Sequence, residues 1–250
     1  MNLEYSKCQW EMMYPQDALE KIRETGVVYF PFGCVEEHGT HNVMIVDFVP
    51  VHRLALETAE RVPGLVYPPL LVAPAGAPPK TREEMREAFL YPPSVFLSVE
   101  CCRQVYEEML ENFARMGFRC CVAIGGHGPA IALMGKIADE LGGRINGMDI
   151  LNYSWPRAKG LREAFPYVLG HGEALESSLG WAMHPEAANP ERIHEVHTRN
   201  IRSQLAHWSE EDLTKFAAEM SPELGQRLLD FLVSDLAETV RERQQGAVGL

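Results

Sequence analysis

The sequence predicts an α/β fold, a three-layer α/β/α sandwich with a mostly parallel central sheet. Strand-like and helical patterns alternate along the chain, which is typical of parallel strands joined by crossover helices. No internal repeat or low-complexity segment interrupts this alternation. The length of 250 residues, with 46% hydrophobic and 23% charged residues, suits one large folded core. We therefore expect a single domain that spans residues 1–250.

The N-terminal third contains two expected strands with a helix between them. Residues 27–32 form a short β-rich apolar run, which is typical of a buried strand. Residues 33–46 are expected to form a loop, and the helical spacing of apolar residues over 48–62 predicts a helix after it. Residues 65–72 predict a second strand, whose two prolines favour the edge of the sheet.

The middle of the chain adds a long loop, a helix and a third strand. Residues 74–93 are rich in proline, alanine and charge, and long loops of this kind often border active sites. Apolar residues recur every three or four positions over 95–116, which predicts an amphipathic helix packed on the sheet. Residues 119–124 predict the next strand.

The second half continues the alternation. Residues 125–129 predict a tight turn, 130–141 a helix and 148–153 another strand. Ser221-Pro222-Glu223 combines a capping serine, a proline in the first turn and an early acid, which together predict a helix start. This helix is expected to continue to Val240.

Charge and hydropathy exclude several classes of partner. The 35 acidic and 23 basic residues give a formal net charge of -12, which disfavours nucleic acid and anionic membranes as partners. The longest apolar stretch, 65–79, contains five prolines and cannot form a membrane helix. The N-terminus lacks the basic and apolar regions of a signal peptide, so a cytoplasmic protein is expected. The expected partner is a small-molecule substrate.

The six cysteines do not form a disulfide or zinc-knuckle pattern. They include two adjacent pairs but no C-x-x-C, and they are expected to be reduced and mostly buried.

The loop after the first strand carries a candidate metal-binding group. Glu36 and His38 are two residues apart, so an extended backbone directs both side chains the same way. Asp47 adds a carboxylate that could bridge two ions, and carboxylates with imidazole suit Zn²⁺, Mn²⁺ or Fe²⁺. The alternative interpretation is a polar loop in which Asp47 is an ordinary helix N-cap.

Two further segments could carry chemistry. His127 lies between glycines after the strand 119–124, where ligands of α/β folds bind, and the glycines would let a metal or substrate approach the backbone closely. The alternative is a simple turn histidine. His171 precedes an expected helix with Glu176 in its first turns, and a histidine there could move protons. The alternative for this segment is a capping region with solvated acids.

Together, the three segments resemble the creatininase family. The first loop looks like that family's P-x-G-S-x-E-Q-H-G-x-H signature followed by a later Asp, through Pro31, Gly33, Glu36, His38, Gly39, His41 and Asp47. The His127 turn is similar to N-G-H-G-G-N, and the His171 segment resembles H-A-G-x-x-E-T-S. The motifs occur in the family's order over residues 26–183.

The resemblance implies a two-metal hydrolase of a non-peptide C–N bond, often in a cyclic amide, with Zn, Mn or Fe ions. The implied ligands form two sets that share one carboxylate: Glu36, Asp47 and His127 for one ion, and His38, Asp47 and Glu176 for the other. His171 would donate a proton to the leaving nitrogen. Relatives form ring-like or stacked assemblies, so a homo-oligomer, such as a hexamer, is expected.

The chain also departs from the family pattern. Cys34 replaces the usual Ser and Glu37 the usual Gln, while Gly125, Pro129 and Ala130 replace Asn, Gly and Asn around His127. Some members have a metal-binding Glu where this chain has Pro129, which is why Glu176 is the candidate for the missing carboxylate. Two alternatives stay open: a hydrolase of a sugar- or inositol-derived ketone, and a non-catalytic homologue with a decayed site.

Overall fold

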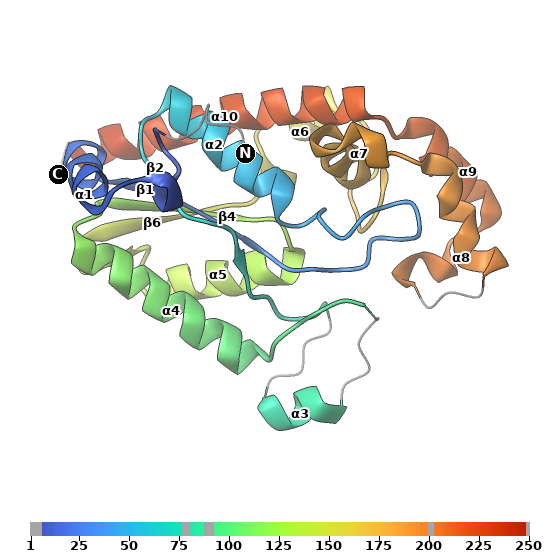
Figure 1. The fold of residues 1–250 in the computed structure, drawn as a ribbon, viewed down its shortest axis with the longest axis horizontal. Helices are drawn as coiled ribbons and strands as arrows, with labels where there is room; N and C mark the ends of the chain where they lie inside the picture. The colour runs from blue at the N-terminus through green and yellow to red at the C-terminus, as the bar shows by residue number, and fades with distance from the viewer. Residues whose placement is uncertain (1–6, 77–80, 88–92, 200–202, 249–250) are drawn as a thin grey trace.

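A mostly parallel sheet of six strands lies between two layers of helices, in a computed structural model that describes residues 7–76, 81–87, 93–199 and 203–248. Helices α2 (Val49–Arg61) and α10 (Pro222–Val248) cover one face, and α4 (Val99–Met116) and α5 (Gly128–Glu140) cover the other (Figure 1). The predicted three-layer α/β/α fold is confirmed.

Strand β1 (Val27–Gly33) lies inside the sheet, and all seven of its residues are buried. It pairs in parallel with β4 (Cys120–Gly125) on one side and with β2 (Leu65–Val66) and β3 (Leu70–Leu71) on the other. Strand β6 (Met148–Tyr153) pairs in parallel with β4. Apolar side chains on both faces of these strands build two cores, one beneath each helical layer.

Two strands differ from the prediction. The expected strand 65–72 lies at the sheet edge as predicted, but it is divided into β2 and β3 because two of the residues between them are prolines, which have no N–H to donate. The short antiparallel strand β5 (Arg144–Ile145) was not predicted. Asn146 and Gly147 both have positive φ and turn the chain into β6, so this Asn-Gly pair was the missed hairpin signal.

Helix α4 begins at Val99, later than predicted, because the Ser98 side chain accepts a hydrogen bond from the Cys101 N–H and caps the helix there. The predicted loop 74–93 contains the short helix α3 (Arg82–Glu87), while residues 77–80 and 88–92 lie outside the described residues.

Helix α7 (Ala174–Met183) is the helix that the sequence predicts after His171. Several other helical elements were not predicted. Besides α3, the helices that were missed are α1 (Pro15–Thr25), α6 (Leu161–Ala164), α8 (Glu195–Thr198) and α9 (Glu210–Glu219), with short 3₁₀ turns η2 (Trp10–Met12), η3 (Trp155–Arg157), η4 (Pro185–Ala187), η5 (Pro190–His194) and η6 (Gln204–His207). Among the described residues, no helix is long and apolar enough to cross a bilayer.

Helices α7 and α10 approach each other closely at Gly225. A Cβ atom at this position would lie 1.8 Å from the backbone oxygen of Ser178. Gly225→Ala is therefore expected to lower the free energy of unfolding by about 1–3 kcal/mol through overpacking, although alanine alone favours a helix by about 1 kcal/mol over glycine. Urea unfolding would measure this loss.

The neighbouring exposed residue Gln226 provides the matched control. Gln226→Ala should change the free energy of unfolding by no more than about 0.5 kcal/mol. A Gly225→Ala protein as stable as this control, or more stable, would contradict the close approach of the two helices.

Candidate metal centre

The candidate residues lie at the carboxyl end of the sheet, where the segments that follow β1 and β4 meet. Glu36, His38 and Asp47 come from the segment after β1, and His127 follows β4. All four side chains are buried, with exposed fractions between 1% and 4%. The structure thus brings together residues that are up to 91 positions apart in the sequence, at the edge where ligands of α/β folds bind.

His127 faces the first pair of carboxylates. Its Nδ1 lies 2.7 Å from Glu36 Oε2 and 3.4 Å from Asp47 Oδ2, while its Nε2 lies 2.8 Å from the Pro74 backbone oxygen. A carbonyl can only accept, so Nε2 donates its hydrogen and Nδ1 is the nitrogen that faces the carboxylates. Burial lowers the pKa of His127, but hydrogen bonds and charges from Asp47 and Glu36 outweigh burial and raise the pKa to about 10.

His38 faces the second pair of carboxylates. Its Nε2 lies 3.3 Å from Asp47 Oδ1 and 3.5 Å from Glu176 Oε2. Its Nδ1 donates to the Glu36 backbone oxygen at 3.1 Å, so the ring orientation is fixed as in metal-ligating histidines. Burial lowers the pKa of His38, but Asp47 and Glu176 outweigh burial and raise the pKa well above its ordinary value.

Asp47 presents a different oxygen to each histidine, Oδ2 to His127 and Oδ1 to His38. Burial raises the pKa of Asp47, but the two histidines outweigh burial and hold the pKa well below its usual range. The interpretation of Asp47 as a helix N-cap is wrong, because Phe48 occupies that position and no side chain caps α2. The ionised carboxylate is therefore free to contact cations on two sides.

Gly126, directly before His127, lies where no side chain would fit. A Cβ atom on Gly126 would lie 1.6 Å from the backbone oxygen of Asp47. The expected space for a metal or substrate is therefore filled at Gly126 by the backbone of Asp47. The contact locks the two site segments against each other.

His171 and Glu176 approach the group from α7 and the residues before it. The His171 ring stacks on His38, with ring centroids 4.1 Å apart, and its Nε2 donates to the Glu37 backbone oxygen at 2.6 Å. The Glu176 carboxylate accepts a hydrogen bond from the Gly172 N–H at 2.7 Å as well as facing His38. All six residues singled out by the sequence therefore share one site.

Sequence reasoning missed the contribution of Ser203 and of Gln204, the residues at which η6 begins. The Gln204 side chain donates to Glu36 Oε1 at 2.9 Å. The buried Glu37 carboxylate accepts hydrogen bonds from the Ser203 hydroxyl, the Gln204 N–H at 3.2 Å and the Gly39 N–H at 2.6 Å. Glu37 thus ties the loop after β1 to residues more than 160 positions away, and its replacement of the family's usual Gln was the only signal in the sequence.

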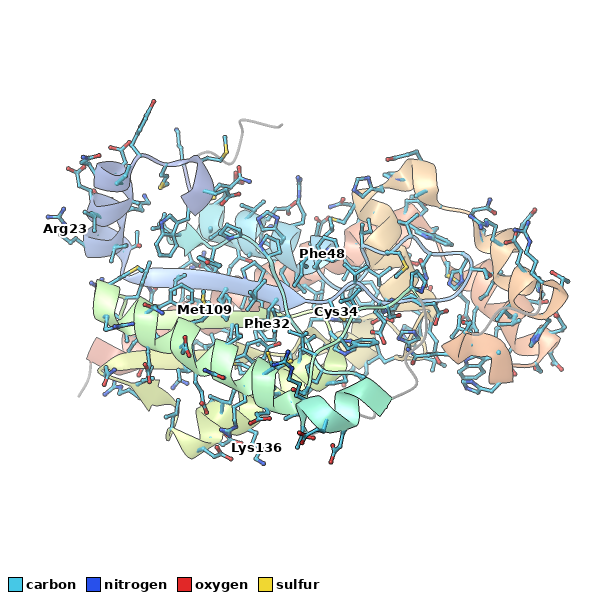
Figure 2. The ribbon with its side chains drawn as sticks, turned by 60° about the horizontal axis from the view of Figure 1, so that its bottom comes forward. Arg23, Phe32, Cys34, Phe48, Met109 and Lys136 are labelled. Carbon is cyan, nitrogen blue, oxygen red and sulfur yellow. The ribbon has the colours of Figure 1, made fainter. Side chains whose placement is uncertain are left out.

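Cys34 was also missed as part of the site. It lies at the end of β1, just beyond Phe32 (Figure 2), and is 1% exposed. Its thiol donates to Asp47 Oδ2 at 3.0 Å. Burial and the neighbouring carboxylates of Asp47 and Glu36 raise the pKa of this thiol far above its ordinary value.

A cavity of about 300 Å³ opens onto these residues. The site carboxylates and histidines form one side, and the remaining wall is mainly apolar, with Trp155, Pro156, Leu169, Pro129 and Ile131. Gly76 also lines the cavity, so the beginning of the predicted loop 74–93 borders the site as expected. The volume suits a small molecule.

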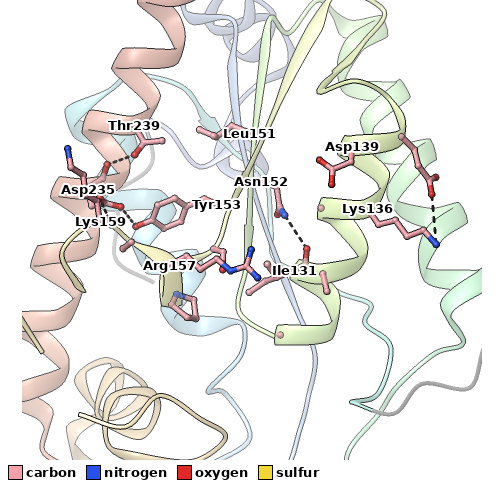
Figure 3. A pocket seen from close by; sticks show the side chains of 17 residues that line it. Ile131, Lys136, Asp139, Leu151, Asn152, Tyr153, Arg157, Lys159, Asp235 and Thr239 are labelled. Carbon is pink, nitrogen blue, oxygen red and sulfur yellow. Dashed lines mark hydrogen bonds and ion pairs between the residues drawn. The ribbon is translucent and has the colours of Figure 1, made fainter. Parts of the chain in front are cut away.

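A larger cavity of about 820 Å³ adjoins this one between α5, β6 and α10 (Figure 3). Gly128, Ile131 and Pro156 line both cavities. Figure 3 shows the Arg157 guanidinium directed toward Ile131, and a Tyr153–Asp235 hydrogen bond of 2.7 Å on the opposite side.

The donor atoms fit metal ions. Among the described residues, three groups have ligand atoms within 4.8 Å of one another: Cys34, Glu36, Asp47 and His127; Glu36, His38 and His171; and His38, Asp47 and Glu176. A divalent cation would stabilise these buried carboxylates in place of the protonated histidines that face them. Two of the groups share Asp47, as the sequence-based ligand sets did.

Comparisons with known proteins identify a family and a fold. The family model described as "Creatininase: Creatinine amidohydrolase" matches residues 11–240. Similar solved structures include a mutant creatininase of the Zn-Zn type, with 20% identity, a TM-score of 0.68, and 94% of this chain and 97% of that chain covered. Others are a creatinine amidohydrolase, with a TM-score of 0.67, and a structure described as "Creatininase Mn", with a TM-score of 0.66. Both are 21% identical, with 95% of this chain and 98% of each covered. None of the curated proteins matches.

Proposed function

The chain belongs to the creatininase family, and from this premise we propose that it is a metal-dependent amidohydrolase with two divalent ions, Zn²⁺, Mn²⁺ or Fe²⁺. The proposed reaction is hydrolysis of a non-peptide C–N bond in a small, cyclic amide, of which creatinine is the first substrate to test. Relatives with the same fold include creatininases of the Zn-Zn type and with Mn in their description.

One observation carries the proposal: Asp47 directs one oxygen to the group with His127 and the other to the group with His38. Glu36 and His127 would hold one ion with Asp47, and His38 and Glu176 would hold the other. A single carboxylate between two donor groups could hold two ions about 3.5–4 Å apart, the spacing found in two-metal hydrolases.

Two ions bound in this way would supply a Lewis acid for the amide carbonyl and lower the pKa of a water. The protein's own groups would do the rest. His171 Nε2 is engaged with the Glu37 carbonyl, which leaves His171 Nδ1 to exchange a proton with the leaving nitrogen. Gln204 would hold Glu36 in place through its 2.9 Å hydrogen bond.

The cavity wall favours an amide over the alternative substrates. A sugar- or inositol-derived ketone would need polar groups for its hydroxyls, whereas Trp155, Pro156 and Leu169 present apolar surface. The decayed-site alternative rested on the loss of a carboxylate at Pro129. Glu176 lies 3.5 Å from His38 and offers a replacement carboxylate.

Metal content tests the proposal directly. Protein dialysed against zinc or manganese is expected to retain close to two ions per chain, and it should hydrolyse creatinine or another small cyclic amide. A chelator should abolish turnover, and metal should restore it. Elemental analysis of replete protein that finds well under one ion per chain would rule out the two-metal site.

The oligomeric state is a separate proposal that rests on family membership. We expect a homo-oligomer, with a hexamer as one such form. Light scattering in solution should then give a multiple of the 28.1 kDa chain mass. A mass of one chain would contradict it.

A further inference from the structure

We propose that Cys34 is a ligand of the ion held by Glu36, Asp47 and His127, which makes that position a mixed thiolate, carboxylate and imidazole site that favours Zn²⁺ over Mn²⁺. This inference rests on the proposed function, since it assigns a further donor to one of the two proposed ions. The other position, with His38, Asp47 and Glu176, has only nitrogen and oxygen donors.

The geometry of the buried thiol supports the assignment. Cys34 Sγ lies 3.0 Å from Asp47 Oδ2, the same oxygen that faces His127 Nδ1 at 3.4 Å. Glu36 Oε2 lies 2.7 Å from that nitrogen. All four donor atoms lie within 4.8 Å of one another. Tetrahedral zinc ligands at about 2.0–2.3 Å from the ion are roughly 3.3–3.8 Å apart, so small side-chain adjustments suffice.

The position of Cys34 in the fold also favours a ligand. It directly follows β1, between a buried strand and the loop that carries Glu36, so its backbone is well fixed. Its side chain is 1% exposed, and its sulfur contacts the Asp47 carboxylate as well as the apolar core. A thiol is only a weak hydrogen-bond donor, so its hydrogen bond to Asp47 contributes little to stability. Binding of the sulfur to an ion would give the buried thiol a stronger interaction.

Metal binding at Cys34 exchanges the thiol proton for the metal ion. The S–H bond breaks, the proton leaves to solvent, and the freed sulfur electron pair forms the bond to the divalent ion. Soft thiolate ligands favour zinc, whereas an all-oxygen and nitrogen set also suits manganese. The two metal positions would therefore differ in their selectivity for zinc over manganese.

Cobalt substitution distinguishes a ligand from a hydrogen-bond donor. A cobalt-loaded protein is expected to have the near-ultraviolet charge-transfer absorption of a Co²⁺–thiolate bond. Cys34→Ser should lose this absorption while the visible cobalt bands persist. Cys101→Ser, which changes an exposed thiol on α4, should keep the thiolate absorption. The spectrum requires no substrate, so it does not depend on turnover.

Metal selectivity provides a second measurement. Serine can still donate a hydrogen bond to Asp47, so a purely orienting role predicts unchanged zinc affinity in Cys34→Ser. A ligand role predicts that zinc affinity falls by at least about 10–100-fold, the loss that even outer-shell changes cause, while manganese affinity changes less. The preference for zinc over manganese should fall accordingly.

The outcomes separate this inference from the proposed function. Two bound cobalt ions per chain without a thiolate absorption, or with an absorption that survives Cys34→Ser, would overturn the Cys34 assignment and leave the two-metal hydrolase standing. A protein that binds no cobalt would overturn both. Loss of the absorption in Cys34→Ser alone would establish the ligand.

Discussion

Replacing Asp47 with asparagine is expected to remove at least one metal ion and to lower kcat/KM by about 10²–10³-fold or more, the scale of losing one key electrostatic group. Asparagine keeps the volume of the side chain but loses its charge, and one of its two terminal atoms becomes an N–H donor. Because Asp47 directs one oxygen to His38 and the other to His127, both groups of ligands lose their shared carboxylate.

The fold should survive Asp47→Asn, since no side chain caps α2 and Phe48 occupies its N-cap position. Circular dichroism should be unchanged, while elemental analysis and steady-state kinetics should both change. Asp230→Asn provides the control, because it makes the same substitution on the exposed face of α10. Full activity with two ions in Asp47→Asn would refute the bridging role.

The fold could be predicted where local pattern and burial agree. Strands β1 and β4 are short apolar runs with every residue buried, and both follow directly from the sequence. The prediction failed where two local preferences compete, as at 65–72, where apolar β-formers favour one strand and two prolines interrupt it. Strand β5 has only two residues, too few for a strand pattern, so the Asn-Gly pair after it was the only signal of its hairpin.

The site could be predicted where it belongs to short motifs next to strands. Glu36, His38 and His127 each follow a strand that the sequence identifies, so their meeting at one edge follows from parallel topology. Ser203 and Gln204 could not be found in this way. They reach Glu37 and Glu36 from a segment with no hydrophobic period, and contacts across more than 160 residues leave no local trace.

What each residue does in the site was harder to predict than which residues belong to the site. The glycine before His127 was interpreted as room for a ligand, yet it admits the backbone of Asp47. In the sequence, Cys34 stands out only as a replacement of the family's serine, because the sequence does not reveal which way its side chain points. Its 3.0 Å contact with Asp47 depends on the packing of the loop after β1.

His171 and Glu176 are expected to fail in different ways when replaced. His171→Ala should keep both ions and lose turnover by about 10²–10⁴-fold, the typical contribution of a general acid or base. Its Nε2 already donates to the Glu37 carbonyl, and its ring stacks on His38 without facing Asp47. Glu176→Ala should instead weaken metal binding, because its carboxylate lies 3.5 Å from His38 Nε2.

Metal titrations followed by kinetics would separate the two roles. Activity of Glu176→Ala should partly return at high metal concentration, whereas that of His171→Ala should not. His184→Ala, which removes a half-exposed histidine beyond the end of α7, should leave both properties unchanged. The reverse pattern would reassign the ligands, since His171 also has a ring nitrogen within 4.8 Å of donor atoms on Glu36 and His38. In that case His171 would replace Glu176 in the second ligand set, and the proton to the leaving nitrogen would have to come from another group.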